Sequence, residues 1–382
     1  MSDLTIENAI NPTSQGKLMH QGMPPLDMSG PALSYFEFWS PRVFYIPIVI
    51  QTILLAIRYV GPTLPTAANP SFPMGGLVGE SKKTILSLAT GMAKDHIAPF
   101  THIRRHEAKD DLNADAHLAE IRMQEAGLSY PLVAKPDMGG RGVGVQIVRN
   151  REELLAYLES FPDNADILLQ ELIPYEAEAG VFYIRDPDQD QGNIFSVTLK
   201  YFPYVIGDGS RTLRELIEQD ERAGQISHIY LKRHEARLEE VIPLGQPYRL
   251  AFAGSHSRGT IFRDGRDFVT NEMTDAIDKI AKDIPDFYFG RFDIRFKSMD
   301  DFQKGQNFKI VEVNGAGGEA THIWDRKQTL RQAYGTLFSQ YAALFRIGAK
   351  NRKRGHKPDS IFALLKAWQD EKKLVANYPH TE

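Results

Sequence analysis

Gly290-Arg-Phe-Asp293 and, further along the chain, Val311-Glu-Val-Asn314 give the strongest signal in the sequence. Each reads as a strand whose alternate residues share one face, so Arg291 would lie beside Asp293 and Glu312 beside Asn314. If the two strands pair, one surface holds two carboxylates, an amide oxygen and a guanidinium. Such oxygen ligands suit Mg²⁺, and a guanidinium neutralises charge on a transferring phosphoryl group. An ordinary charged strand pair on the surface is the alternative.

A glycine-rich loop after a short apolar strand forms the second motif. The strand Pro131-Leu-Val-Ala-Lys135 ends in a lysine, and the glycines Gly139, Gly140, Gly142 and Gly144 follow. A lysine in this position is well placed to meet an anion, and glycines let backbone N–H groups converge on phosphate oxygens. The loop matches neither the Walker P-loop nor the Rossmann fingerprint. Many tight turns look similar, so the loop alone is not specific.

The third motif is a strand that ends in polar residues. Leu168-Leu-Gln170-Glu171 runs into a turn, and Glu178 follows a few residues later. Such a segment can form a hinge whose backbone reads an adenine edge, with the later carboxylate on the ribose hydroxyls. Taken alone, a strand end with solvated acids explains it equally well.

Along the chain the glycine-rich loop comes first, the strand that ends in polar residues second, and the two charged strands last. Taken together in that order, the three motifs resemble the ATP-grasp superfamily. Gly290–Asp293 and Glu312–Asn314 resemble D-alanine–D-alanine ligases, and Gly207-Asp-Gly-Ser-Arg-Thr-Leu-Arg-Glu-Leu-Ile217 resembles cyanophycin synthetase and related amide ligases. The resemblance covers about residues 130–345. It implies an ATP-grasp fold, in which two α+β lobes clasp ATP. Strands and helices interleave along the chain, which independently indicates an α/β or α+β class.

The resemblance also implies a role for each matching residue. Two Mg²⁺ ions, for which Mn²⁺ can substitute, would be held by Asp293, Glu312 and Asn314. The transferring phosphoryl group would be met by Arg291 and, as a weaker candidate, Arg258, while Gly315, Gly317 and Gly318 would lie near the acceptor. ATP would be bound by Lys135, Gly139, Gly140, Gly142, Gly144, Gln170, Glu171, Glu178 and Lys200.

The function implied is an ATP-dependent carboxylate–amine ligase that forms an amide or peptide bond through an acyl phosphate. One alternative is a kinase on the same fold, with His322 or Asp325 as the base for a hydroxyl acceptor. Another is a non-catalytic ATP-binding module tethered to a membrane or a partner. The sequence does not identify the acid, the amine or the oligomeric state.

Composition narrows the remaining possibilities. The chain of 382 residues contains no cysteine, which excludes disulfide scaffolds, thiolate metal sites and cysteine nucleophiles. Its formal net charge of −4 gives no global attraction to nucleic acid or to an anionic membrane, so any such attraction would have to be local. The absence of cysteine fits the reducing cytoplasm, and the resemblance implies small-molecule carboxylate and amine substrates. We expect four parts, namely a disordered tail (1–30), an atypical N-terminal region (31–129), an ATP-grasp domain (130–348), and a basic linker with a C-terminal helix (349–382).

The N-terminal region departs from these ligases, which usually begin with a Rossmann-like domain. Residues 43–57 are almost all apolar and are flanked by Trp39, Arg42, Arg58 and Tyr59, residue types common at membrane interfaces. Pro47 argues against an uninterrupted spanning helix. Two interpretations remain open, a helix buried in the core or a peripheral contact with a membrane. The Pro- and Gly-rich residues 61–81 that follow indicate a loop.

Overall fold

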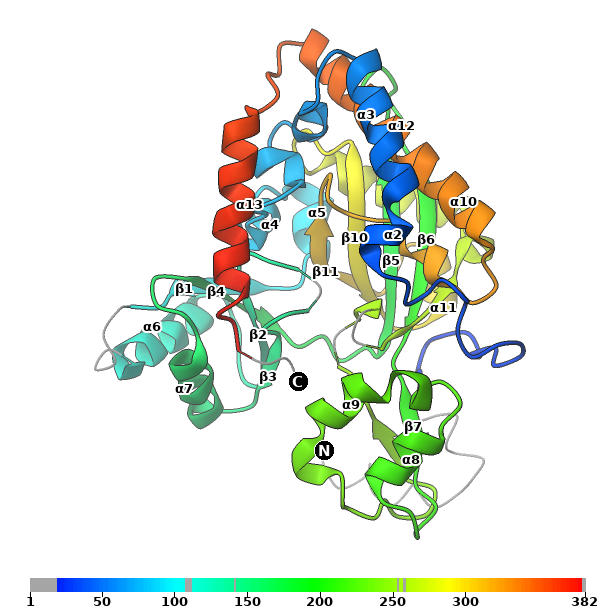
Figure 1. The fold of residues 1–382 in the computed structure, drawn as a ribbon. Coiled ribbons are helices and arrows are strands. Elements are labelled where there is room, and N and C mark those ends of the chain that lie inside the picture. Colours follow the sequence, from blue (N-terminus) through cyan, green and yellow to red (C-terminus); the bar gives the residue numbers. More distant parts are fainter. Residues whose placement is uncertain (1–18, 107–111, 141, 253, 257–258, 380–382) are drawn as a thin grey trace.

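The computed structural model describes residues 19–106, 112–140, 142–252, 254–256 and 259–379. Two antiparallel sheets with their helices form two lobes around a cavity, and a small third unit lies below them (Figure 1). The expected mixed class of helices and strands is therefore confirmed. Residues 1–18 of the expected tail lie outside the described residues. The disorder expected for 19–30 is wrong, because Met23 and Leu26 pack against the core of the second lobe.

The first lobe is a four-stranded sheet in the order β1-β4-β2-β3. Helix α6 packs on β1, and α7 packs on β3 and α6. Its elements are β1 (Phe100–Arg104), α6 (Leu112–Glu125), β2 (Leu132–Pro136), β3 (Gln146–Val148), α7 (Arg151–Ser160) and β4 (Asp166–Glu171). Strand β1 and helix α6 precede residue 130, so this lobe begins earlier than the boundary expected from the resemblance.

The second lobe is a five-stranded sheet in the order β11-β10-β5-β6-β9. Helix α10 covers β5 and β6, and a core rich in phenylalanine, including Phe287, Phe292 and Phe296, fills the space beneath. The elements are β5 (Ala177–Ile184), β6 (Asn193–Tyr201), β9 (Ile261–Asp264), α10 (Asn271–Lys282), β10 (Phe289–Phe296), α11 (Met299–Gln303) and β11 (Phe308–Asn314).

The small third unit has a core of its own. A two-stranded ribbon packs with two short helices, the first of which begins with a capping box between Thr212 and Glu215. Its elements are β7 (Tyr204–Ile206), α8 (Leu213–Gln219), α9 (Ser227–Arg233) and β8 (Pro247–Arg249). This unit contains residues 207–217, whose sequence resembles cyanophycin synthetase and related amide ligases.

The N-terminal region reaches both lobes. It contains α2 (Pro41–Phe44), α3 (Ile46–Arg58), two 3₁₀ turns (Leu64–Ala67 and Pro73–Gly76), α4 (Lys82–Ser87) and α5 (Gly91–His96). Helices α4 and α5 pack on β11. The loop at Gly76 meets the chain just beyond β11, where a Cβ on Gly76 would lie 2.6 Å from the Cα of Gly315. Small residues in the Pro/Gly loop are therefore required by this close approach.

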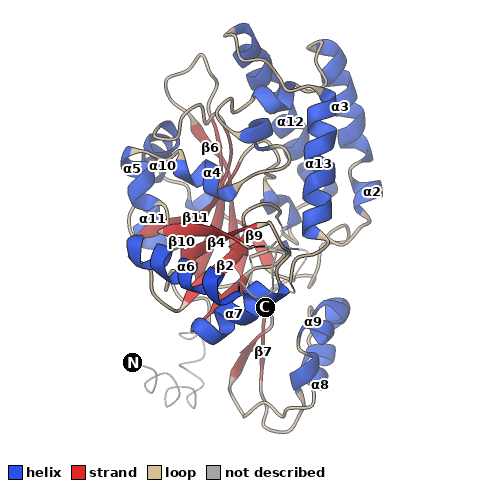
Figure 2. Ribbon diagram, turned by 90° about the vertical axis from the view of Figure 1, so that its left-hand side faces the viewer, coloured by secondary structure: helices blue, strands red, loops and turns tan. Residues whose placement is uncertain are grey.

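Two long helices complete the structure. Figure 2 shows α3, α12 (Leu330–Lys353) and α13 (Ile361–Val375) gathered on one side of the sheets. We expected a linker to begin at residue 349, but its first residues are helical, because α12 continues to Lys353. Lys350, Arg352 and Lys353 fall in its last turn, where cations interact favourably with the helix dipole.

Candidate active site

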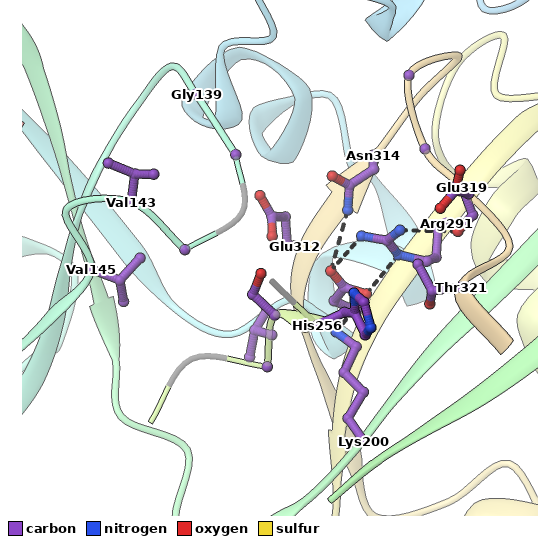
Figure 3. Close-up of a pocket in the computed structure, with 18 of the residues that line it drawn as sticks. Gly139, Val143, Val145, Lys200, His256, Arg291, Glu312, Asn314, Glu319 and Thr321 are labelled. Atoms are coloured by element: carbon purple, nitrogen blue, oxygen red, sulfur yellow. Dashed lines mark hydrogen bonds and ion pairs between the residues drawn. The ribbon is translucent and has the colours of Figure 1, made fainter. Parts of the chain in front are cut away.

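A cavity of about 920 Å³ opens between the two lobes, and its walls come from both of them. The first lobe contributes Lys135, the glycine loop and Gln170, and the second contributes the polar ends of β10 and β11. Figure 3 shows the glycine loop on one side of this space and Arg291, Glu312 and Asn314 on the other.

Strands β10 and β11 pair antiparallel, as the sequence motif requires. The register sets Asp293 opposite Glu312 and Arg291 opposite Asn314, so all four side chains project from one surface. The Arg291 guanidinium donates to both oxygens of Asp293, from Nε to Oδ1 at 2.9 Å and from Nη2 to Oδ2 at 3.1 Å. Burial works against the charged guanidinium, but Asp293 outweighs it and raises the pKa of Arg291.

Lys200 binds the same carboxylate from β6, which is separated from β10 by β5. Its Nζ lies 3.0 Å from Asp293 Oδ1 and 2.9 Å from Glu178 Oε1. Burial disfavours the charged amine, yet Asp293 and Glu178 together raise the pKa of Lys200 above its usual value. Arg295 contacts Glu178 from the other side at 3.4 Å. Glu178 thus lines the cavity between Lys200 and Arg295, and the ribose contact expected from it stays a prediction.

Lys135 has a different electrostatic setting although it is also buried. Its Nζ donates to Gln170 Oε1 at 2.7 Å and, across the cavity, to the carbonyl of Val311 at 2.9 Å. Within the described part of the chain it forms no ion pair with a carboxylate. Burial lowers the pKa of Lys135 to about 8, although Glu312 acts in the opposite direction. Because its ammonium group is not paired with any described carboxylate, Lys135 is able to bind an anion without breaking an ion pair.

The glycine loop takes conformations that favour glycine. The backbone φ is +102° at Gly139, +69° at Gly142 and +72° at Gly144, while Gly140 has open space where a Cβ would be. Lys82 Nζ donates to the carbonyl of Gly139. Residue 141 of this loop is not described. At the hinge, Gln170 is buried and Glu171 is exposed, and both line the cavity.

Two residues from the N-terminal region enter the site without having been predicted. Glu80 accepts a hydrogen bond from the backbone N–H of Gly315, and burial raises the pKa of its carboxyl to about 8. The Nζ atom of Lys82 lies 3.6 Å from Oε1 of Glu312. A signal was present, since Glu80 is the first acidic residue after Glu37, and it ends the glycine-rich segment.

The far end of the cavity is aromatic and contains two carboxylates, Glu319 and Glu37, of which Glu37 is paired with His256. Glu319 accepts hydrogen bonds from Tyr45 Oη at 2.5 Å and Trp324 Nε1 at 3.1 Å. The Arg291 guanidinium donates to the Glu319 carbonyl at 3.0 Å, which links this end to the phosphoryl end. Trp324 stacks on His256 with their ring centroids 5.0 Å apart. Tyr45, from the apolar N-terminal segment, was not expected in the site.

The remaining candidates lie elsewhere. Arg258 is outside the described residues. His322 is buried, and this burial lowers its pKa to about 4. Asp325 accepts the backbone N–H of Asp264 at 2.7 Å and so holds a loop. Neither His322 nor Asp325 is among the described residues that line the cavity.

The donor set of β10 and β11 fits Mg²⁺. The described residues include no group of three or more His, Cys, Asp or Glu side chains that could hold a metal alone. Asp293, Glu312 and the amide of Asn314 nevertheless form a hard oxygen set on one surface. Mg²⁺ keeps several waters and takes the rest of its ligands from one or two carboxylates and substrate phosphates, so this small set is sufficient.

Comparison with known proteins confirms the resemblance that the motifs indicate. The chain is 31% identical over 134 residues to a D-alanine–D-alanine ligase of Bacillus anthracis, a match that covers 32% of this chain and 42% of the relative. The chain therefore spans less than half the length of this relative. No protein-family model matches the chain.

Solved structures of similar proteins include two ligases. The crystal structure of the D-alanine–D-alanine ligase from Bacillus anthracis has a TM-score of 0.38 and 14% identity, and covers 75% of this chain and 71% of its own. The VanG D-Ala:D-Ser ligase from Enterococcus faecalis has a TM-score of 0.38 and 16% identity. This match covers 69% of the present chain and 62% of the VanG chain. Superposition at this level carries no functional conclusion, so function is inferred from the site itself.

Proposed function

We propose that this protein is an ATP-dependent carboxylate–amine ligase that works through an acyl phosphate. The observation that supports this most is the convergence of Lys135 from one lobe with Arg291, Asp293 and Glu312 from the other around a single cavity. A buried lysine that forms no ion pair within the described residues, a glycine-rich loop and a hard oxygen set are the parts that phosphoryl transfer requires.

In the first step a carboxylate oxygen of the acid substrate attacks the γ-phosphorus of ATP, and ADP leaves. Lys135, Lys200 and the N–H groups of the glycine loop bind the phosphates, and Arg291 neutralises charge on the transferring group. Asp293, Glu312 and Asn314 would hold two Mg²⁺ ions, or Mn²⁺ in their place, whose charge offsets that of the triphosphate. The chain mainly contributes positioning and electrostatics.

In the second step the bound ammonium first releases a proton to water, the neutral amine nitrogen attacks the acyl carbon, inorganic phosphate leaves, and the nitrogen loses its second proton as the amide forms. We assign binding of the amine, in its ammonium form, to the Glu319 carboxylate. That carboxylate is fixed by Tyr45 and Trp324 at the end of the cavity that adjoins Arg291. Gly317 and Gly318 line the cavity between Asn314 and Glu319, whereas a Cβ on Gly315 would meet the backbone of the Pro/Gly loop, and we assign the acceptor to this stretch.

The kinase alternative is less well supported. It requires a base near the acceptor hydroxyl, and the two residues considered for that role, His322 and Asp325, do not line the cavity. The third alternative, a non-catalytic module, predicts ATP binding without turnover.

We also propose that the enzyme works in the cytoplasm, where ATP is supplied, and that its membrane contact, through residues 43–57, is peripheral. Within the described residues, none of the helices combines the length and apolar character needed to cross a bilayer.

Calorimetry tests the assignment of the nucleotide site. We expect wild-type protein to bind ATP only with Mg²⁺, and the Lys135→Ala, Glu312→Ala double variant to lose this binding. Leu244→Ala, at an exposed position of the third unit, is the matched control. Unchanged ATP affinity in the double variant would show that ATP binds elsewhere.

A further inference from the structure

The solvent-facing side of α3 is apolar along its whole length. Eight large aliphatic side chains on α2, α3 and the following turn are each 54–81% exposed. They are Val43, Ile46, Val49, Ile50, Ile53, Leu54, Ile57 and Val60. Only Phe44 and Ile48 of these two helices are buried. The interpretation of 43–57 as a buried core helix is therefore wrong for most of its side chains.

The exposed residues form one continuous stripe. They recur at intervals of three and four, which places them on one side of the helix. The opposite side packs on α12, where Phe44 and Ile48 meet Ala333 and Leu337. Between α3 and α12 the stripe widens into an apolar groove of about 440 Å³ that includes Ile50, Leu54 and Phe338. Exposed apolar surface of this extent on a single chain marks a binding site.

The charges and aromatic residues around the stripe indicate what covers it. No acidic residue occurs between Glu37 and Glu80, while Arg42 and Arg58 stand exposed near the two ends of α3. Tyr35 and Trp39, just before the helices, are 67% and 40% exposed. Cations and amphipathic aromatic rings at the ends of an apolar surface are typical of contact with lipid headgroups.

A second copy of the chain fits this surface less well. Packing two stripes against each other around a two-fold axis would bring Arg42 and Arg58 of both copies together. The segment between Glu37 and Glu80 supplies no carboxylate to pair with them. An anionic bilayer has the complementary charge, so the arginines favour lipid over self-association.

We propose that the exposed stripe of α3 docks in the plane of an anionic lipid bilayer. A helix of 13 residues is about 20 Å long, too short for the roughly 30 Å of a hydrocarbon core. Because α12 holds its opposite side, α3 lies flat and inserts only its apolar side chains, as interfacial helices do.

Helix α13 extends the docking surface. It lies on the same side of the molecule as α3, at the right of Figure 2. Its exposed apolar side chains include Phe362 at 81% and Trp368 at 52%, and they alternate with exposed charged residues, namely Lys366, Asp370, Lys372 and Lys373. Lys353 is the last residue of α12 and Lys357 lies in the connection to α13, so both add positive charge between the two helices. Two helices thus contribute to one contact.

Docking has a consequence for the substrate, which rests on the proposed ligase function. Phe38, Trp39 and Tyr45 line the aromatic end of the cavity and immediately precede α3. Docking of α3 therefore brings this end of the cavity close to the lipid. The substrate class that fits is an amphiphilic acid or amine whose apolar part resides in the bilayer.

Vesicle flotation of the full chain tests the docking without any need for ATP or turnover. The probe is vesicles of equal parts phosphatidylglycerol and phosphatidylcholine at low salt, compared with phosphatidylcholine alone. We expect wild-type protein to float with the anionic vesicles, and the Ile50→Asp, Ile57→Asp variant to lose about tenfold or more of its bound fraction. Leu244→Asp, at an equally exposed leucine on the third unit, is the matched control and should float as wild type does.

Several outcomes would overturn the proposal. If wild-type protein does not float with the anionic vesicles, α3 does not dock on lipid. The same conclusion follows if the Ile50→Asp, Ile57→Asp variant floats as well as Leu244→Asp. Light scattering that finds a wild-type dimer and a monomeric Ile50→Asp, Ile57→Asp variant would assign the stripe to self-association. Loss of the circular dichroism signal in that variant would show a buried helix. Absence of ATP turnover in protein that floats would count against the ligase function alone.

Discussion

Lys135→Met is the substitution that best separates a ligand-binding lysine from a structural one. The pKa of Lys135 is lowered by burial from 10.5 to about 8. This difference corresponds to about 3 kcal/mol of destabilisation at pH 7. Methionine removes that cost but leaves Gln170 and Val311 without a hydrogen-bond donor, which offsets part of the gain. We therefore expect the variant without nucleotide to be at least about as stable as wild type.

The sign of the pH dependence follows from the same shift. The folded protein binds this proton more weakly than the unfolded chain does, so the unfolded state holds more protons between pH 8 and 10.5. Wild-type stability should rise across that window because of Lys135, and Lys135→Met should lack this contribution. Lys200→Met is the contrast, because it leaves the buried carboxylates of Asp293 and Glu178 without their shared cation. Breaking such a buried pair costs about 3–5 kcal/mol.

Urea denaturation at pH 7 and at pH 9, with and without Mg-ATP, measures these effects. We expect Mg-ATP to stabilise wild type and to leave Lys135→Met unchanged, since binding to the folded state alone raises stability. The reasoning fails if Lys135→Met is destabilised as much as Lys200→Met, or if ATP stabilises it to the wild-type extent. Either result would make Lys135 a structural residue.

Three further predictions concern the cavity and its surroundings. Asp293→Asn, Glu312→Gln and Asn314→Ala should each remove turnover while circular dichroism still shows folded protein, because Mg²⁺ geometry depends on these oxygens; near-normal rates would show that the metal site is misassigned. Arg291→Lys should lower kcat by at least about 100-fold, because an ammonium cannot replace the bidentate guanidinium, and a smaller loss would reduce Arg291 to a general positive charge. His322→Gln should weaken the loss of stability as pH falls from 6.5 to about 4, since the neutral buried histidine must be protonated on unfolding, and an unchanged slope in urea titrations would place the titrating group elsewhere.

The parts of the fold that the sequence predicts are those in which local pattern and burial agree. Strand β10 (Phe289–Phe296) contains the Gly290–Asp293 motif that the sequence predicts to be a strand, and it pairs with β11 in the register that the motif needs. The short edge strand β1 was missed. Only Ile103 of Phe100–Arg104 is buried, so neither alternation nor an apolar run marks it.

The parts that could not be predicted depend on contacts between distant segments. Glu80 and Lys82 reach the site only because the Pro/Gly loop approaches the chain beyond β11. Glu319 is oriented by Tyr45, which is 274 positions away along the chain. Residues 43–57 are apolar on every side of the helix, so periodicity cannot tell which side is buried. The structure answers this by packing one side on α12.

The central claim is acyl phosphate chemistry, and the transfer of an isotope from the acid tests it most directly. Paired acids and amines, with amphiphilic ones included, would first be screened for ADP release in the presence of vesicles. The active acid would then be labelled with ¹⁸O in its carboxylate, and the products analysed by mass spectrometry. We predict that steady ADP release requires both substrates, that an amide forms, and that the released inorganic phosphate gains one ¹⁸O atom. Unlabelled phosphate, or a phosphate group that stays on a single acceptor, would contradict the account.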